Sequence, residues 1–253
     1  MSLDTSKPIS KITYNSIEIP IASPGEGSTY IEYTSLDSFG RVFTAKFRGT
    51  IVPEYAFAYL AELTAVDMPD NVTAISNSGF YRCQKLTLTS LPSGITSLGD
   101  FAFLNCYQLS LTTLPSGITS IGQYAFNNCP RLALTSLPSG ITSLPTAAFQ
   151  YCPKIAFTTF PSGMTSIGDY VFRNCYQLSS ITFPPALISI GDFAFANCTG
   201  LETVKFTSTM SSIPNGVFSG CTKLSTIYVP WSQGQVENAP WGASNATIIY
   251  NYT

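Results

Sequence analysis

Apolar residues recur in this sequence at a constant spacing of 23 residues. In seven consecutive copies, a cysteine is preceded three positions earlier by a phenylalanine. The cysteines are Cys83, Cys106, Cys129, Cys152, Cys175, Cys198 and Cys221. The phenylalanines are Phe80, Phe103, Phe126, Phe149, Phe172, Phe195 and Phe218. A unit of this length cannot bury its apolar side chains alone, whereas copies stacked in register share one core, so the pattern predicts a solenoid.

Two aliphatic columns belong to the same frame. Three positions after each cysteine lie Leu86, Leu109, Leu132, Ile155, Leu178, Leu201 and Leu224. Eight positions before each lie Ile75, Leu98, Ile121, Leu144, Ile167, Ile190 and Ile213. An earlier copy keeps the frame with Val52, Phe57 and Leu63, but has Leu60 in place of the cysteine. We therefore expect about eight coils, between residues 46 and 230.

Each coil is expected to contain a short β-strand after its cysteine. Residues 178–184 (LSSITFP) and 224–230 (LSTIYVP) illustrate the pattern, and a proline ends each of them. Proline has no N–H group, so the end of a strand is a favourable position for it. Stretches such as 191–198 (GDFAFANC) are too short for a long helix and predict a turn or a single helical turn. The expected fold class is a repeat solenoid with a parallel β-sheet on one face and turns or short helical turns on the other.

The nearly complete repeat at 178–201, LSSITFPPALISIGDFAFANCTGL, resembles the BspA-like class of leucine-rich repeats. The resemblance implies a curved, right-handed, β-rich superhelix. It also implies a bacterial protein that is secreted or displayed on the cell surface, and that binds rather than catalyses. It implies no particular ligand.

The two ends of the chain fall outside the repeat and are expected to cap the solenoid. Apolar and polar residues alternate within residues 1–45, which predicts an N-terminal β cap with a turn at 23–28. Residues 231–253 are expected to form a C-terminal cap, with a final strand at 246–250. Trp231 and Trp241 are expected to cover the last coil; the alternative is a platform for a carbohydrate or a peptide.

Four central coils depart from the apolar pattern of the later ones. Later coils place apolar residues three, six and eight positions after the cysteine, whereas the central coils place them at three, five and eight. The shifted residues are Leu88, Leu111, Leu134 and Phe157. If the backbone repeats unchanged, they form an exposed apolar stripe and a candidate binding site. We favour a position in the core, because four such side chains are costly to leave in water.

Ligand contacts are expected at the outward positions of the predicted strands, seven residues after each cysteine. These positions hold Ser90, Thr113, Ser136, Thr159, Thr182, Lys205 and Tyr228. The surface around them is low in charge and rich in Ser, Thr and Tyr, which suits a protein or glycan ligand.

Common catalytic and metal-binding patterns are missing from the sequence. The chain has no histidine, which removes the usual general base and histidine-ligated metals. The cysteines never lie closer than 23 residues, whereas zinc sites need closely spaced pairs. We favour a structural ladder of free thiols over disulfides, because parallel side chains rarely offer disulfide geometry. The recurring acids Asp100, Asp169 and Asp192 are expected to cap turns rather than bind calcium. We predict no enzyme activity, metal or cofactor.

Charge and hydropathy narrow the possible partners. Charged residues make up 10% of the chain and the net charge is −2, without a basic cluster, so a nucleic-acid partner is not expected. No apolar run is long enough to cross a membrane, and the N-terminus has no signal-peptide pattern. The solenoid, combined with a surface that is low in charge and rich in Ser, Thr and Tyr, favours a non-enzymatic binding or adhesion module at the cell surface or outside the cell. The alternative is a structural spacer or assembly component, such as part of a surface layer or phage tail, that acts through its caps. Oligomeric state does not follow from the sequence.

Overall fold

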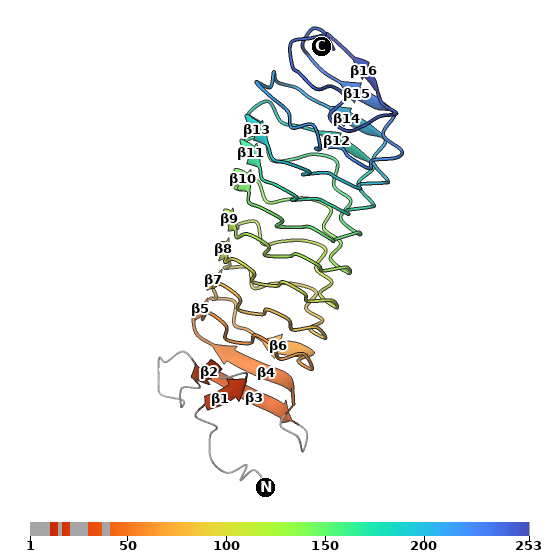
Figure 1. Cartoon of the computed structure of the whole chain (residues 1–253). Helices are drawn as coiled ribbons and strands as arrows, with labels where there is room; N and C mark the ends of the chain where they lie inside the picture. The colour runs from red at the N-terminus through yellow and green to blue at the C-terminus, as the bar shows by residue number, and fades with distance from the viewer. Residues whose placement is uncertain (1–10, 15–16, 21–29, 37–40, 253) are drawn as a thin grey trace.

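The computed structural model describes residues 11–14, 17–20, 30–36 and 41–252. These residues build a parallel β-solenoid of about nine turns of about 23 residues each (Figure 1). The coils stack along one axis, with the N-terminal strands at one end and β16 at the other. The expected repeat solenoid is confirmed.

Two-residue strands line one side of the solenoid (Figure 1). One parallel sheet consists of β5 (Ile51–Val52), β7 (Ala74–Ile75), β8 (Ser97–Leu98) and β9 (Ser120–Ile121). A second consists of β10 (Ser143–Leu144), β11 (Ser166–Ile167) and β13 (Ser189–Ile190). In each of these strands the second side chain is buried, while the first is at least partly exposed. This side of the solenoid is therefore largely a surface of small hydroxyl side chains.

Pro145 separates these two sheets. The equivalent position in neighbouring coils holds a glycine whose N–H donates to a carbonyl of the preceding coil, as from Gly122 to Leu98 and from Gly168 to Leu144, both at 2.8 Å. Proline has no N–H to donate, so the corresponding bond to Ile121 cannot form. β9 and β10 therefore belong to different sheets.

The longer strands lie on the opposite side, toward the two ends of the solenoid (Figure 1). Near the C-terminus, β12 (Ser180–Thr182), β14 (Thr203–Lys205), β15 (Thr226–Tyr228) and β16 (Thr247–Ile249) pair in parallel. Near the N-terminus, β3 (Tyr30–Leu36) pairs antiparallel with β4 (Val42–Arg48), which pairs in parallel with β6 (Ala65–Asp67). β1 (Lys11–Tyr14) and β2 (Ile17–Pro20) form a separate antiparallel pair. Parallel strands thus occupy two sides of the solenoid, not the single face that the sequence predicts.

The strand expected after every cysteine forms only after Cys175, Cys198 and Cys221. In the four preceding coils no strand is assigned at this place in the described chain. There, two successive side chains, such as Thr112 and Thr113, are both exposed. A pleated strand sends successive side chains to opposite faces, so the shifted apolar pattern of these coils interrupts the strand.

Of the two expected alternatives, a turn or a single helical turn, the structure has turns, and no helix forms in the described part of the chain. Phe101 and Asn105 adopt left-handed backbone conformations, with φ of 58° and 62°. The N–H groups of Phe101, Phe103 and Asn105 donate to carbonyls of the next coil at 2.7–3.0 Å. The intervening N–H groups donate within the turn, as from Leu104 to Phe101 at 3.1 Å. Because alternate N–H groups bond to the neighbouring coil, the i to i−4 bonds of an α-helix cannot form.

The phenylalanine column forms a stack through the core. Ring centroids are 4.8 Å apart between Phe57 and Phe80, and 5.7 Å apart between Phe149 and Phe172. In both pairs the ring planes lie within 5° of parallel. All the rings of this column are fully buried, so the stack ties successive coils together by apolar contact.

Each cysteine thiol links its coil to the preceding one. The thiol of Cys83 donates a hydrogen bond to the carbonyl oxygen of Phe57 at 2.9 Å. The same bond recurs in every copy, at 2.9–3.3 Å. All seven thiols are free and buried, and burial raises the pKa of the Cys152 thiol to about 12. The cysteines therefore act as buried hydrogen-bond donors as well as small apolar groups.

Buried aromatic side chains cover both ends of the repeat. Phe47 of β4 is buried in the same apolar cluster as the first coil. At the other end, the rings of Trp231 and Trp241 lie 5.3 Å and 6.0 Å from the ring of Phe206. Both tryptophans are buried, so the alternative in which they form a binding platform is wrong.

β16 lies within the predicted final strand at 246–250, whereas the turn expected at 23–28 lies outside the described residues. The division into residues 1–45, 46–230 and 231–253 stays a prediction.

Candidate binding surfaces

The residues predicted to contact a ligand fall into two structural groups. Ser90, Thr113, Ser136 and Thr159 are exposed, but they lie in coils without a strand at this place. Thr182, Lys205 and Tyr228 are half-buried and lie side by side on β12, β14 and β15, with Ile249 of β16 next in register. A single β-bridge joins Thr159 to Thr182. The structure thus brings the C-terminal members of the predicted row onto one sheet.

Lys205 lies against two adjacent tyrosine rings at this sheet. Its ammonium nitrogen is 5.1 Å from the ring centroids of both Tyr228 and Tyr252. It also donates a hydrogen bond to the Tyr252 hydroxyl at 3.3 Å. The two rings are 4.7 Å apart, and cation–π attraction favours this arrangement. Lys205, Tyr228 and Tyr252 form what we call the Lys–Tyr cluster, which combines one positive charge with two aromatic rings.

The alternative of an exposed apolar stripe on the central coils is wrong. Leu111, Leu134 and Phe157 are buried. Leu88 is partly buried and packs against the same core. The threonines that follow them, such as Thr112 and Thr135, are exposed. In these coils the backbone interrupts the alternation of inward and outward side chains at a different place than in the later coils. This change is favourable because it buries the four apolar side chains.

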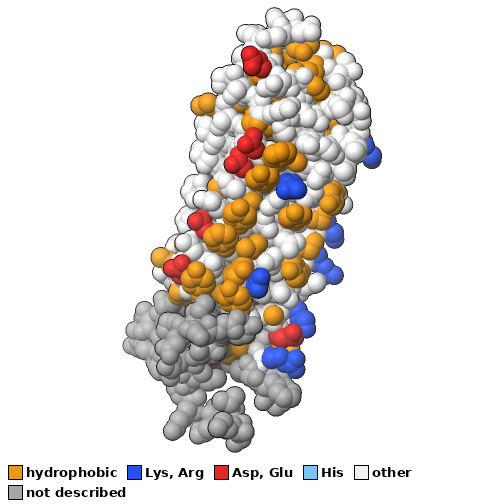
Figure 2. Space-filling view, in the orientation of Figure 1, with side chains coloured by type: hydrophobic (Ala, Val, Ile, Leu, Met, Phe, Trp, Pro, Cys, Tyr) orange, Lys and Arg blue, Asp and Glu red, His pale blue; other side chains and the backbone are white. Residues whose placement is uncertain are grey.

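A second surface, which the sequence analysis did not single out, lies over the turns that contain the cysteines. We call it the turn face, and it extends in each coil from six residues before the cysteine to two residues after it. Large aromatic side chains are exposed along it: Tyr55, Phe101, Tyr151, Tyr176 and Phe193. Figure 2 shows apolar side chains as a band that follows the solenoid. The solenoid therefore carries an aromatic surface away from the predicted ligand row.

The aromatic rings on the turn face stack in pairs. The rings of Phe101 and Tyr124 are 5.3 Å apart, and those of Tyr170 and Phe193 are 5.7 Å apart and within 3° of parallel. Their backbones are left-handed, with φ between 53° and 59°. The small Ala147 separates the two pairs in sequence. Within the band, the guanidinium of Arg173 lies 5.7 Å from the ring centroid of Tyr170.

The recurring aspartates occupy one margin of the turn face. Asp100 Oδ1 accepts the backbone N–H of Gln123 at 2.7 Å, and Asp169 Oδ1 accepts that of Asp192 at 2.8 Å. The carboxylates of Asp100 and Asp169 thus cap the backbone at the same position of the next coil. In the described residues no group of three His, Cys, Asp or Glu side chains is placed to hold a metal ion.

A shallow depression of about 390 Å³ lies beside Pro145, over β10, β11 and β13. Its lining consists of uncharged residues, including Gln123 and Thr146. It holds none of the ionisable side chains that acid–base or nucleophilic chemistry uses. The structure also contains no helix of the length and hydropathy needed to span a membrane, as far as the described residues extend.

Comparisons with known proteins agree with this architecture. A protein-family model described as "BspA type Leucine rich repeat region (6 copies)" matches residues 50–176 and 142–240. A leucine-rich repeat protein from Bacteroides ovatus superposes with a TM-score of 0.61 at 23% identity, covering 96% of this chain and 68% of that one. The pneumococcal vaccine antigen PcpA superposes with a TM-score of 0.54 at 14% identity, covering 85% of this chain and 69% of that one. A search of curated proteins found no match.

Proposed function

Because the chain belongs to the BspA-type leucine-rich repeat family, we propose that it is a non-enzymatic binding module at the cell surface or outside the cell. In this proposal it recognises a protein or glycan through the exposed face of β12, β14, β15 and β16. The observation that carries the proposal is the Lys–Tyr cluster on that face.

The cluster suits recognition because its rings and its ammonium group offer different kinds of contact and are held in fixed positions. Tyrosine rings offer apolar contact together with a hydroxyl group, and the ammonium group of Lys205 can pair with an anionic or hydroxyl-bearing group of the ligand. Parallel pairing from β12 to β16 fixes the positions of these side chains. A rigid surface binds with a smaller entropic cost than one that must be ordered on binding.

Neighbouring side chains extend the same surface. Ser180, Thr203, Thr226 and Thr247 form a second in-register row on these strands. Their hydroxyl groups can donate and accept hydrogen bonds. A row of hydroxyls beside two tyrosine rings fits the mixed polar and apolar surface of a sugar chain or a peptide.

The proposed location rests on relatives. One structural neighbour is a pneumococcal vaccine antigen, and the family resemblance implies bacterial proteins outside the cell. A non-enzymatic role is supported by the absence of histidine from the sequence. It is also supported by the burial of all seven thiols, because reactive cysteines are at least partly exposed to solvent.

Paired screens test the proposal. The labelled full chain is applied to a glycan array and to immobilised extracellular proteins, alongside Lys205→Ala/Tyr228→Ala. The matched control is Thr142→Ala, which removes an exposed hydroxyl from the opposite side. We expect a ligand that binds the unsubstituted chain and the control, with affinity reduced at least about tenfold in the double variant. A ligand whose affinity is unchanged by the double substitution would place recognition elsewhere, and no ligand in either screen would contradict the proposal.

A further inference from the structure

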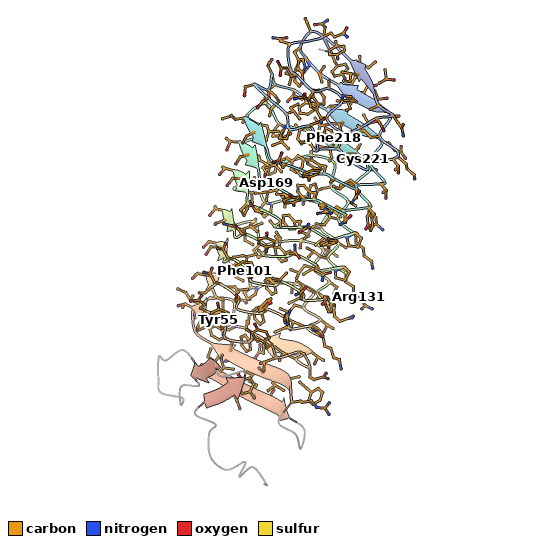
Figure 3. The ribbon with its side chains drawn as sticks, in the orientation of Figure 1. Tyr55, Phe101, Arg131, Asp169, Phe218 and Cys221 are labelled. Atoms are coloured by element: carbon orange, nitrogen blue, oxygen red, sulfur yellow. The ribbon has the colours of Figure 1, made fainter. Side chains whose placement is uncertain are left out.

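The two margins of the turn face carry opposite charges. Six positions before the cysteine, the charged residues are Asp100, Asp169 and Asp192. Two positions after the cysteine, they are Lys85, Arg131, Lys154 and Lys223. In Figure 3, Asp169 and Phe101 are labelled toward the margin beside β8–β11 and β13, and Arg131 lies toward the opposite one. Figure 2 shows acidic groups mainly along the first margin and basic groups mainly along the second, with the apolar band, which itself contains basic groups, between them.

No coil from that of Cys83 to that of Cys221 carries an acidic residue at one margin and a basic residue at the other. From the coil of Cys83 to that of Cys221, each coil carries one charged side chain at one margin or the other. Asp100 is one coil from Arg131, Asp169 is one coil from Lys154, and Asp192 is one coil from Lys223. Adjacent coils are separated by about 4.8 Å, the spacing of neighbouring strands. A long basic side chain can reach across that distance to a carboxylate, if the two margins are brought together.

A two-fold axis parallel to the solenoid brings the margins together. If a second copy faces the first and is rotated about such an axis, its acidic margin lies over the basic margin of the first copy. Heights along the solenoid are unchanged by that rotation, so Asp192 of either copy comes within one coil of Lys223 of the other. Rotation about a perpendicular axis in the same plane would instead place acid over acid.

We propose that the turn face binds the turn face of a second copy of this chain, in parallel orientation and with this two-fold symmetry. The exposed rings of Phe101, Tyr151, Tyr176 and Phe193 would be buried between the copies, and the two margins would form ion pairs along both edges. Burial of the rings supplies the main attraction, and the charges select the orientation.

A second copy fits this surface better than another partner because of its spacing. The charges and rings are separated by multiples of the rise of one coil, and a second solenoid has the same rise, so each aspartate of one copy stays within one coil of a basic residue of the other. A sugar chain could stack on individual rings, but it offers no pair of oppositely charged margins. This proposal is independent of the ligand surface on β12, β14, β15 and β16, which lies outside the turn face.

Charge reversal tests the proposed arrangement. Sedimentation velocity of the full chain at low salt, over micromolar to millimolar concentrations, is expected to show a monomer–dimer equilibrium. Lys223→Asp or Asp192→Lys alone should raise the dimer Kd about tenfold, because each substitution acts at two symmetry-related places. The combination of both should restore the original Kd. Lys205→Asp, outside the turn face, is the matched charge control and should leave the dimer unchanged.

The aromatic band is tested separately. Phe193→Asn keeps a residue type that tolerates left-handed backbone, removes an exposed ring, and should weaken the dimer more than either charge reversal. Ile188→Asn removes a side chain that is 68% exposed outside the turn face, and should have no effect. Cross-linking with a carbodiimide should join Asp192 of one copy to Lys223 of the other.

Three results would overturn the proposal. They are a monomer at millimolar concentration, a dimer that is insensitive to Phe193→Asn, and a double charge reversal that fails to restore the dimer. Binding of a glycan that depends on Phe193 in a strictly monomeric protein would assign the turn face to a sugar ligand. Circular dichroism confirms that each variant is folded. Because Lys205→Asp affects only the ligand surface and Lys223→Asp only the turn face, failure of one proposal is distinguishable from failure of the other.

Discussion

The thiol of Cys129 donates a hydrogen bond to the carbonyl oxygen of Phe103, which lies 26 residues earlier in the preceding coil, at 3.1 Å. Phe103, whose carbonyl accepts this bond, also stacks its ring on that of Phe126, which lies in the coil of Cys129. The thiol column and the ring column therefore join the same pairs of coils. A residue at the cysteine position therefore contributes both apolar volume and a donor.

Substitutions at Cys129 are expected to separate these two contributions. Cys129→Val keeps apolar volume but removes the donor, and should lower the free energy of unfolding by about 0.5–1.5 kcal/mol. Cys129→Ala also leaves a cavity and should cost about 1–3 kcal/mol. Urea denaturation measures both, with the exposed Ser136→Ala as control. Equal stability of the Val variant and the unsubstituted chain would show that the thiol bond contributes nothing.

Folding stability is expected to fall at alkaline pH. An unfolded thiol ionises near its ordinary pKa of 9.0, whereas burial raises the pKa of Cys152 to about 12. Burial also raises the pKa of the Cys106, Cys129 and Cys175 thiols. Since these raised values belong to the folded state, the stability they represent is fully present below about pH 9 and is lost as pH rises toward the folded values. Each thiol contributes a slope of about 1.4 kcal/mol per pH unit in that window.

Urea midpoints between neutral pH and pH 10 measure this dependence. Replacing one thiol, as in Cys152→Val, should make the decline above pH 9 shallower. Identical slopes for the variant and the unsubstituted chain would contradict the assignment to buried thiols.

Two glycines are expected to respond oppositely to alanine. A Cβ at Gly122 would lie 2.4 Å from backbone atoms of Gly99 and Asp100 in the preceding coil, so Gly122→Ala should cost about 2 kcal/mol or more. A Cβ at Gly163 would meet nothing within 4 Å, and the backbone there is not left-handed. Gly163→Ala should be neutral or stabilise by up to about 1 kcal/mol, through the unfolded state. Thermal unfolding of the two variants measures both effects. A stable Gly122→Ala variant together with a destabilised Gly163→Ala variant would refute the prediction.

The buried pair Asn127 and Gln150 is expected to show strong coupling. Asn127 Nδ2 donates to Gln150 Oε1 at 2.8 Å, and both residues are buried. Asn127→Leu leaves the Gln150 amide without this donor and should cost about 1–3 kcal/mol. Asn127→Leu/Gln150→Leu should recover part of that loss, because neither polar group then remains. A double-mutant cycle measures the coupling, and additive effects would argue against the bond.

The core columns could be predicted because they depend on spacing alone. A residue repeated every 23 positions, such as Cys129 or Phe126, occupies the same place in each coil whatever the path of the backbone. The location of the strands could not be predicted in the same way. It depends on whether neighbouring side chains such as Thr112 and Thr113 alternate, and on whether position 145 can donate a hydrogen bond.

The candidate surfaces were predictable to a lesser extent. The outward position of Lys205 follows from the repeat, but its partner Tyr252 lies beyond the repeat and is 47 residues away. Aromatic residues are usually found in the interior, so Phe101 and Phe193 gave no signal of exposure. Both residues adopt left-handed backbone conformations in the turns, which their spacing in the sequence does not predict.

The buried thiols also make the opening of a coil hard to reverse in an oxidising medium. While a coil is closed, its cysteine is buried and out of reach of oxidants. If a coil opens in an oxidising medium, the sulfur can form a sulfenic acid or a mispaired disulfide, and neither product fits between the packed coils. Each opening then risks being a one-way event, so survival in such a medium would depend on how rarely the coils open rather than on the folding equilibrium.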